Sequence, residues 1–344
     1  MNAKTIIALD AMSGDRGPEA VVSAAAFTVK EYSNVQLILV GDQAMLETLV
    51  NKKSLAPAQR QRLSIQHASQ VVTMEDPPAQ ALRSKKDSSM RVAIDLVKQG
   101  KAQACVSAGN TGALMATARF VLKMISGIDR PAICSALPAM QGHTFMMDLG
   151  ANVDCTSEHL YQFALMGSVL VKALDAVESP RIGLLNIGSE EIKGNDVVKQ
   201  ASQLLANSSL NYIGYVEGND IFNNKADVVV ADGFTGNVAL KSAEGLAHMI
   251  SAYLRSEFKR NPLTLVAGLV SLPVLQSFKR RIDPRRYNGA TLLGLQGIVI
   301  KSHGSADKLA FANAIKIAML EVEHNVIAVI DKQINALEAS QGNT

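Results

Sequence analysis

The sequence predicts an α/β fold: a Rossmann-like layered sheet, mostly parallel, with helices on both faces. Short apolar, β-branched runs alternate with longer stretches of helical periodicity, and this alternation is typical of βαβ units. Apolar residues make up 48% of the 344 residues and charged residues 19%, so a wholly disordered chain is excluded. Aromatic residues are only 4%, which predicts a core of small aliphatic side chains.

Strands are expected where apolar and β-branched residues run together without interruption. These runs cover residues 5–11, 35–40, 104–107, 132–137, 144–149, 181–187, 211–216, 227–231 and 297–301. Helices are expected between most of them. Two stretches show helical spacing clearly, with apolar or small residues every three or four positions: residues 158–177, and 315–329 within one long C-terminal helix.

No repeat or low-complexity linker divides the chain. We therefore expect a single α/β domain over residues 1–337, followed by a flexible tail at 338–344. Cys105, Cys134 and Cys155 are odd in number and widely spaced, so buried free thiols are expected rather than disulfides or a zinc site. Because neither a signal peptide nor a membrane-spanning apolar run is evident, a cytoplasmic protein is expected.

Five of the predicted strands run into loops rich in Gly, Asn, Ser and Asp. These loops cover residues 10–15, 107–112, 186–191, 232–237 and 301–305. Such loops expose backbone N–H groups at the start of the next helix, where the helix dipole also favours an anion such as phosphate. Since parallel strands present their carboxyl ends at one edge of a sheet, we expect the loops to form one shared site.

The loops supply the candidate residues for phosphate or substrate binding: Asp10, Gly14, Ser107, Asn110, Thr111, Gly112, Ser189 and Lys193. Several have a structural alternative, because Asp10 suits a turn or a helix cap, Asn110 and Thr111 suit capping, and Lys193 suits a solvated ion pair. Lys301 and His303 follow a β-branched apolar run, where a charge is costly to bury without a partner. We therefore expect a functional role for both.

The standard cofactor and hydrolase motifs are missing. GxGxxG does not follow the first strand, and GxxxxGK[ST], HExxH and GxSxG are not found. Asp148 and Asp154 flank Asn152, but turn formation is the favoured role there over a metal site. The sequence thus predicts no metal and no cofactor.

The charge is unevenly distributed. The total is +3, which gives no footprint of a nucleic-acid-binding protein, yet residues 255–286 hold eight basic and two acidic residues, or +6. Between two basic clusters lies an apolar stretch, 262–278, interrupted by Gly268 and Pro273. This pattern predicts a protruding helical hairpin with an apolar tip and basic flanks.

The hairpin has three candidate roles: reversible contact with an anionic membrane surface, a buried subunit contact, or docking of an acidic protein. The residues expected to make the membrane or carrier-protein contact are Lys259, Arg260, Leu265, Leu269, Val270, Leu272, Lys279, Arg280 and Arg281.

Ordered blocks over nearly the whole chain resemble the bacterial phosphate acyltransferases of phospholipid synthesis, the PlsX family. The resemblance begins at Ala8-Leu-Asp-Ala-Met12 and continues through Lys85-Lys-Asp-Ser-Ser-Met90, Val106-Ser-Ala-Gly-Asn-Thr-Gly-Ala113, Arg130-Pro-Ala132, Asp148-Leu-Gly-Ala-Asn152, Leu185-Asn-Ile-Gly-Ser-Glu-Glu191, Gly214-Tyr-Val-Glu-Gly218, Ala231-Asp-Gly-Phe-Thr-Gly-Asn237 and Lys301-Ser-His-Gly304. Ser13 and Asn288 depart from it, since each stands where the family usually has the first of two glycines.

The resemblance implies a fold like that of phosphotransacetylases and isopropylmalate dehydrogenases, and a homodimer. It implies transfer of a long-chain acyl group from acyl carrier protein to inorganic phosphate, giving acyl phosphate. A membrane acyltransferase would then use this product to acylate glycerol 3-phosphate. We therefore expect a cytoplasmic enzyme that contacts the inner membrane surface peripherally.

The chemistry of this reaction fits the polar loops. Phosphate is itself an anionic nucleophile, so no covalent acyl-enzyme is expected, and the protein must align phosphate with the thioester and stabilise an oxyanion. We expect Ser107, Asn110 and Thr111 to help hold phosphate and Lys301 or His303 to stabilise the oxyanion or the leaving sulfur. Asp232 and Asn237 would orient the reacting groups.

Two alternatives belong to other classes of protein. One is a metal- and nicotinamide-dependent decarboxylating dehydrogenase on the same kind of fold, and the other is a non-enzymatic scaffold at a membrane surface. The missing dinucleotide motif weighs against the first, and the five polar loops have no purpose in the second.

Overall fold

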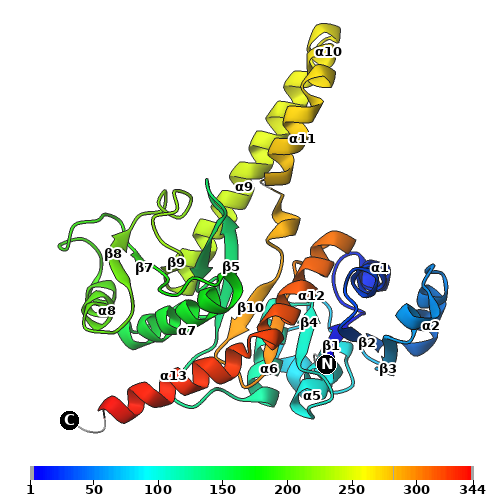
Figure 1. Cartoon of the computed structure of the whole chain (residues 1–344), viewed down its shortest axis with the longest axis horizontal. Helices are drawn as coiled ribbons and strands as arrows, with labels where there is room; N and C mark the ends of the chain where they lie inside the picture. The colour runs from blue at the N-terminus through cyan, green and yellow to red at the C-terminus, as the bar shows by residue number, and fades with distance from the viewer. Residues whose placement is uncertain (1–3, 282, 342–344) are drawn as a thin grey trace.

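The computed structural model describes residues 4–281 and 283–341, and the chain within these ranges builds one eleven-stranded sheet (Figure 1). Its order is β3-β2-β1-β4-β11-β10-β5-β6-β9-β7-β8. The strands are β1 (Thr5–Asp10), β2 (Val35–Gly41), β3 (Leu63–His67), β4 (Ala104–Ser107), β5 (Ala132–Pro138), β6 (His143–Met147), β7 (Ile182–Leu185), β8 (Tyr212–Val216), β9 (Val228–Val230), β10 (Ala290–Leu293) and β11 (Ile298–Lys301).

The predicted α/β class is confirmed, and each predicted strand is present with its ends shifted by at most two residues. Two strands escaped the sequence pattern. β3 is an edge strand whose residues are mostly exposed or half-buried, so it does not stand out as an apolar run. β10 ends at Leu293, directly before Gly294, and it is no shorter than β4 or β11, which the pattern did predict.

Strand direction reverses within the sheet, at the step from β5 to β6. β3, β2, β1, β4 and β11 run parallel to one another, and so do β6, β9, β7 and β8. Between these two blocks, β10 is antiparallel to β11 and β5, and β5 is antiparallel to β6. The blocks therefore point in opposite directions, so the expectation that five strand-end loops share one sheet edge is wrong.

Helices cover both faces of the sheet, as the sequence predicts. Side chains alternate along a strand, and in β1 Ile7 and Leu9 pack into one hydrophobic cluster while Ala8 packs into another. The helices are α1 (Gly17–Glu31), α2 (Gln43–Asn51), α3 (Pro57–Arg60), α4 (Pro78–Ser84), α5 (Ser89–Lys98), α6 (Thr111–Leu122), α7 (Ser157–Asp175), α8 (Asp196–Ala206), α9 (Gly233–Phe258), α10 (Pro262–Val270), α11 (Leu272–Arg281), α12 (Lys308–Glu323) and α13 (Val326–Gln341).

The long C-terminal helix of the sequence prediction is two helices. Asn325 adopts a left-handed conformation with φ of 54°, which ends the helical path between α12 and α13. An apolar periodicity that continues through such a residue does not reveal the break. Helix α13 extends to Gln341, so residues 338–341 of the predicted tail are helical, and 342–344 lie outside the described residues.

The predicted hairpin projects from the body of the molecule and is formed by α9, α10 and α11 (Figure 1). It is longer than expected, because much of α9 already extends beyond the sheet, and only Gly233 and Gly236 of this helix are buried. α10 packs against α9 so closely that a Cβ at Gly268 would lie 3.0 Å from the Phe258 ring. No described helix combines the length and apolar character needed to cross a membrane.

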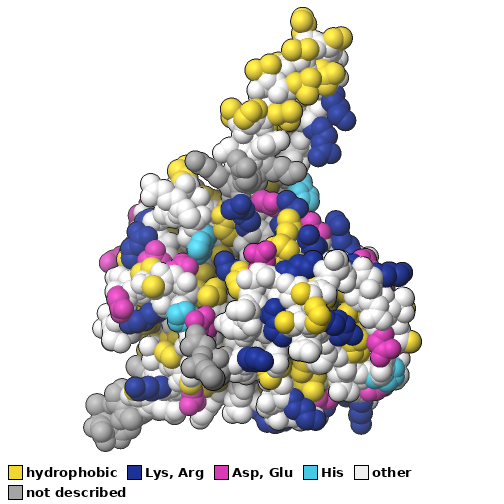
Figure 2. Space-filling view, turned by 45° about the vertical axis from the view of Figure 1, so that its right-hand side comes forward, with side chains coloured by type: hydrophobic (Ala, Val, Ile, Leu, Met, Phe, Trp, Pro, Cys, Tyr) yellow, Lys and Arg dark blue, Asp and Glu magenta, His cyan; other side chains and the backbone are white. Residues whose placement is uncertain are grey.

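Hydrophobic side chains cover much of this hairpin, with Lys and Arg on its flank (Figure 2). The large ones exposed by half or more are Phe234, Val238, Leu246, Tyr253, Leu263, Leu265, Val266, Leu269, Val270 and Val274. Lys259 and Arg260 are also exposed, whereas the side chains of Lys279, Arg280 and Arg281 lie outside the described ones. All three cysteines are free thiols, as expected, and Cys105 and Cys134 are buried.

Candidate functional site

The centre of the site is a buried pair at the ends of adjacent strands. Asp10 ends β1 and is fully buried, and Ser107 ends β4. The Ser107 hydroxyl donates to Oδ2 of Asp10 at 2.7 Å and accepts from the Gly109 N–H at 3.1 Å. Burial raises the pKa of Asp10, and the hydrogen bond from Ser107 opposes this rise.

Lys301 lies beside this pair. It ends β11 in parallel register with Ser107, is only 9% exposed, and its ammonium donates to the Ser302 carbonyl. Burial lowers the pKa of Lys301 to about 8, while the negative charges of Asp15 and Asp10 act in the opposite direction. The group therefore exchanges its proton in the pH range where an ordinary thiol also does.

The loops after β1, β4 and β11 pack tightly against one another at Gly14. This glycine has φ of 90°, and a Cβ there would lie 2.9 Å from the Ala108 Cβ and 3.1 Å from the Gly304 oxygen. The Asp15 N–H donates to Gly304 O at 2.8 Å, and the Ser302 N–H donates to Ser107 O at 2.8 Å. Three of the five predicted loops therefore form one compact cluster.

His303 is held at the rim of this cluster. Its Nδ1 accepts from the Ser305 N–H at 3.2 Å and lies 2.9 Å from the Ser305 hydroxyl, and burial of part of the ring lowers its pKa. Asn288 accepts the His303 N–H at 2.9 Å and donates to Ser302 Oγ and Ala310 O, both at 2.8 Å. The departure at position 288 thus fastens the loop that carries His303, a role that glycine does not perform.

Helix α6 begins in this cluster. The Asn110 side chain caps it by accepting the Ala113 N–H at 3.0 Å, and its amide donates to Met74 O at 2.8 Å and Asp76 O at 3.3 Å. The oxygen and the amide of the Asn110 side chain are therefore both engaged in structural hydrogen bonds. Thr111 and Gly112 follow in the exposed first turn, where backbone N–H groups have no partner within the helix and suit an anion.

The remaining candidates lie elsewhere. Asp232 caps α9 by accepting from the N–H and the hydroxyl of Thr235, both at 2.8 Å, and Asn237 is exposed beside Gly150. Ser189 and Lys193 are exposed in the loop after β7. Because β7 and β9 run opposite to β11, these strand-end loops follow the other edge of the sheet. Among the described residues, the hydrogen bonds of Asp232 stay within its own helix turn and do not reach Asp10, Ser107 or Lys301.

The turn after β6 has the structural role that the sequence favoured for it. The buried Asp148 carboxylate accepts backbone N–H groups of Ile133, Ala151 and Asn152 at 2.7 to 3.1 Å. Among the described residues, no three His, Cys, Asp or Glu side chains gather as a metal site would need.

The sequence reading missed two charged residues of α9. The charge of Lys241 lowers the pKa of both Lys301 and His303, and that of Glu244 raises the pKa of His303. Lys241 and Glu244 form an ion pair at 2.8 Å. α9 therefore passes beside the site although it starts from the other block of the sheet. The only sequence signal was their spacing of four and seven residues from Asn237, which places them on its helical face.

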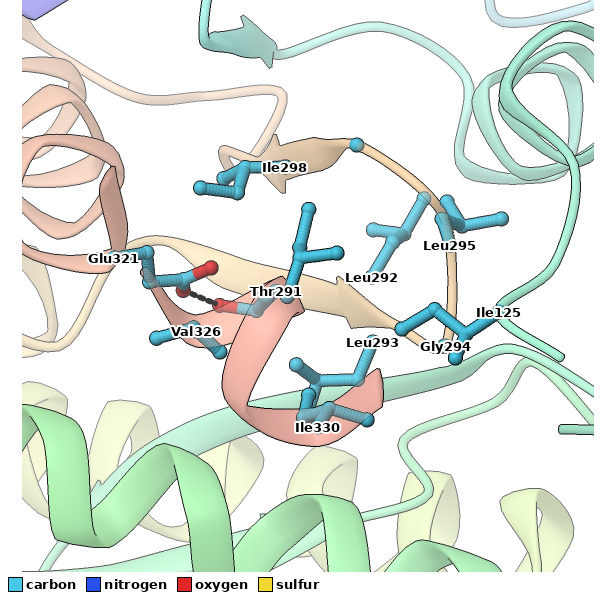
Figure 3. Close-up of a pocket in the computed structure, with 12 residues that line it drawn as sticks. Ile125, Thr291, Leu292, Leu293, Gly294, Leu295, Ile298, Glu321, Val326 and Ile330 are labelled. Carbon is cyan, nitrogen blue, oxygen red and sulfur yellow. Dashed lines mark hydrogen bonds between the residues drawn. The ribbon is translucent and has the colours of Figure 1, made fainter. Parts of the chain in front are cut away.

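A small pocket under β10 is distinct from the site (Figure 3). Its volume is about 10 Å³, enough for about one water molecule, and its lining includes Leu293, Val326 and Ile330. Glu321 faces it, buried and accepting a hydrogen bond from the Thr291 hydroxyl. Burial raises the pKa of Glu321 to about 8, so this carboxyl is mostly protonated at neutral pH.

Solved structures share this fold. A phosphotransacetylase from Streptococcus pyogenes superposes with a TM-score of 0.61 at 19% identity, covering 93% of this chain and 94% of its own. EutD phosphotransacetylase from Staphylococcus aureus gives the same TM-score at 15% identity. At such identity the likeness establishes the fold alone, and it confirms the expected architecture.

Sequence relatives are much closer. The family model described as "Fatty acid synthesis protein" matches residues 5–329. A phosphate acyltransferase from Methylococcus capsulatus is 61% identical over 322 residues, 94% of each chain, and one from Alkalilimnicola ehrlichii is 58% identical over 341 residues, 99% of each chain. This chain therefore belongs to the fatty acid synthesis protein family and is an acyltransferase of the phosphate acyltransferase group.

Proposed function

We propose that the enzyme transfers a long-chain fatty acyl group from acyl carrier protein to inorganic phosphate, giving acyl phosphate for phosphatidic acid synthesis. The observation that carries this proposal is the buried cation Lys301, which ends β11 in register with Ser107 of the Asp10–Ser107 pair. The open first turn of α6 begins four residues after Ser107. A cation and backbone N–H donors suit phosphate, and phosphate needs no activation by the protein to attack a thioester.

The acyl carbon exchanges its bond to sulfur for a bond to phosphate. A phosphate oxygen forms the new C–O bond while the carbonyl oxygen takes up negative charge, and the carbonyl then re-forms as the C–S bond breaks. Lys301 stabilises the negative charge as it develops and gives a proton to the leaving sulfur, because its pKa of about 8 is close to that of a thiol. The carrier leaves as the free thiol, and the Lys301 amine regains its proton from water. Phosphate binds at Thr111 and Gly112 through backbone N–H groups, with Asn110 shaping that turn.

A cysteine acyl-enzyme is not part of this proposal. Burial raises the pKa of Cys105, Cys134 and Cys155, the last to about 11. Thiols with such pKa values are poor nucleophiles at neutral pH, because the thiolate is the reactive form. Direct attack by phosphate therefore accounts for the reaction with the fewest steps.

The hairpin offers surfaces for contact with a membrane and with a second copy of the chain. Its apolar tip exposes several large hydrophobic side chains in a row, with Leu263 83% and Val270 76% exposed, and exposed apolar patches are typical of interaction sites. We propose that the tip contacts the inner membrane surface peripherally, close to the membrane acyltransferase that consumes acyl phosphate. The half-exposed stripe of Leu246, Ile250 and Tyr253 lower on α9 suits contact with a second copy, as a homodimer requires.

The test is incubation of the purified enzyme with acyl carrier thioester and phosphate, scoring acyl phosphate and free thiol together. One thiol per acyl phosphate is expected, and no thiol when phosphate is omitted. Thiol release without phosphate would indicate hydrolysis or an acyl-enzyme, and a lack of acyl phosphate under all conditions would overturn the proposal.

A further inference from the structure

A second basic segment lies outside the hairpin and forms α4, α5 and α6. From Pro78 to Lys123 the chain has eight basic and two acidic residues, a net charge of +6. The hairpin segment 255–286 carries the same net charge, so the rest of the chain carries −9 against the total of +3. The positive charge of this protein is therefore concentrated in two separate segments.

An exposed aromatic ring lies within this segment. Phe120, near the end of α6, is 55% exposed. The Arg91 guanidinium of α5 lies 5.6 Å from the ring centroid, and the Lys123 ammonium lies 5.0 Å from it. Such cation–π contacts hold both basic side chains around the ring. Exposed Arg119 precedes the ring. Arg91 also pairs with Asp95 at 3.1 Å, whereas no ion pair of Arg119 or Lys123 occurs within the described part of the chain.

The same two helices reach the candidate site at their other ends. α6 starts at Thr111, four residues after Ser107 of the Asp10–Ser107 pair, and the first turn of α5 buries Ser89 near Asp10. From Thr111 to Arg119 the helix rises about 12 Å at 1.5 Å per residue. A protein docked at Phe120 would therefore lie beside the site without covering it, as suits a carrier that delivers its thioester on a long flexible arm.

We infer that the surface formed by Arg91, Arg119, Phe120 and Lys123 docks the acidic carrier protein that delivers the acyl thioester. This inference rests on the proposed function. An acidic helical protein complements fixed cations around one aromatic anchor, and such complementarity accelerates association and sets orientation. The surface lacks the contiguous apolar area that the hairpin offers to a membrane, and the negative charge of the rest of the chain disfavours a long polyanion.

The experiment compares steady-state kinetics with acyl carrier protein for wild type and the double variant Arg119→Glu/Lys123→Glu. The KM for the carrier is expected to rise about tenfold or more with kcat within about twofold, since two cations are reversed at the surface and none at the site. Added salt should raise the wild-type KM and affect the variant less. The matched control is Lys316→Glu/Lys332→Glu, the same charge change on exposed lysines of α12 and α13.

Three results would overturn the inference: an unchanged KM in the α6 variant, an equal rise in the control, or a rise confined to Lys259→Glu/Arg260→Glu on the hairpin.

Direct binding of the carrier protein to wild type and variant separates this inference from the proposed function. If wild type binds the carrier and the α6 variant does not, the docking surface stands even when no acyl phosphate is formed. If wild type turns over normally and both proteins bind equally, only the docking surface fails.

Discussion

The Ser107 hydroxyl donates a 2.7 Å hydrogen bond to Oδ2 of Asp10 across the neighbouring ends of β4 and β1. Both side chains are buried away from water, so this hydrogen bond is the main polar contact that stabilises the Asp10 carboxyl beside Lys301. Removing a partner of a buried charge-assisted bond leaves the other group poorly solvated, which costs about 1–3 kcal/mol.

Ser107→Ala should therefore lower the free energy of unfolding by about 1–3 kcal/mol in urea titrations and reduce kcat about tenfold or more. The control is Ser13→Ala, because Ser13 Oγ is 3.4 Å from Ser107 Oγ and makes a weaker contact in the same cluster. Equal losses in the two variants would show that the Asp10–Ser107 bond has no special part.

Lys301 should set the alkaline side of the pH–rate profile. With a pKa of about 8, its ammonium is lost as the pH rises through that value, so kcat/KM should fall above about pH 8. Lys301→Ala should cut turnover at least tenfold, about 1.4 kcal/mol or more in the barrier, with folding intact by circular dichroism. Lys308→Ala, at an exposed lysine of α12, should leave the rate and the profile unchanged.

The Asn110 oxygen caps α6, and its amide donates two hydrogen bonds to the loop at Met74 and Asp76. Variants of Asn110 can remove the amide bonds with or without the cap. Asn110→Ala should destabilise the enzyme by about 1 kcal/mol and lower turnover at least tenfold. Asn110→Asp keeps the capping oxygen and loses the amide donors, so it should recover stability but not the full rate. Near-normal turnover in both variants would remove Asn110 from the phosphate turn.

The hairpin tip should decide membrane contact. Leu269→Asp/Val270→Asp should release the enzyme from anionic vesicles in sedimentation, because charges at the tip oppose burial among lipid chains. Ile187→Asp/Ile192→Asp changes two isoleucines that are about 80% exposed in the loop after β7 and should leave vesicle binding intact. Persistent binding of the tip variant would assign the lipid contact to another surface.

Glu321 should make folding stability depend on pH. Its pKa is about 8 in the folded protein and near 4.5 when unfolded, so the folded state holds the extra proton and loses stability as the pH rises between these values. The expected slope is at most about 1.4 kcal/mol per pH unit. Glu321→Gln stays neutral, so its free energy of unfolding relative to wild type should increase from about pH 5 to pH 9. A constant difference would contradict the raised pKa.

Some residues of the site could be predicted from the local sequence pattern. Lys301 was notable because a charge ended an apolar run, and its burial between three loops explains why that pattern is informative. For Asn110 the pattern did not distinguish a ligand-binding amide from a helix cap, since both favour Asn before a helix. Lys241 could not be placed, because its relation to Lys301 depends on how α9 crosses between the two strand blocks.

The sequence by itself determined the α/β class, the polar loops, the basic apolar hairpin and the family, because these depend on residue spacing and composition along the chain. The tertiary structure alone decided which loops meet. Three antiparallel steps through β10, β5 and β6 reverse the second block, so Ser189, Lys193 and Asp232 were separated from the Asp10–Ser107–Lys301 cluster. Two of these steps, β5–β6 and β10–β11, are hairpins with short connections, but the third pairs Thr291 of β10 with Cys134 of β5. The physical reason is that a local hydrophobic pattern does not encode a pairing between segments so far apart in the chain.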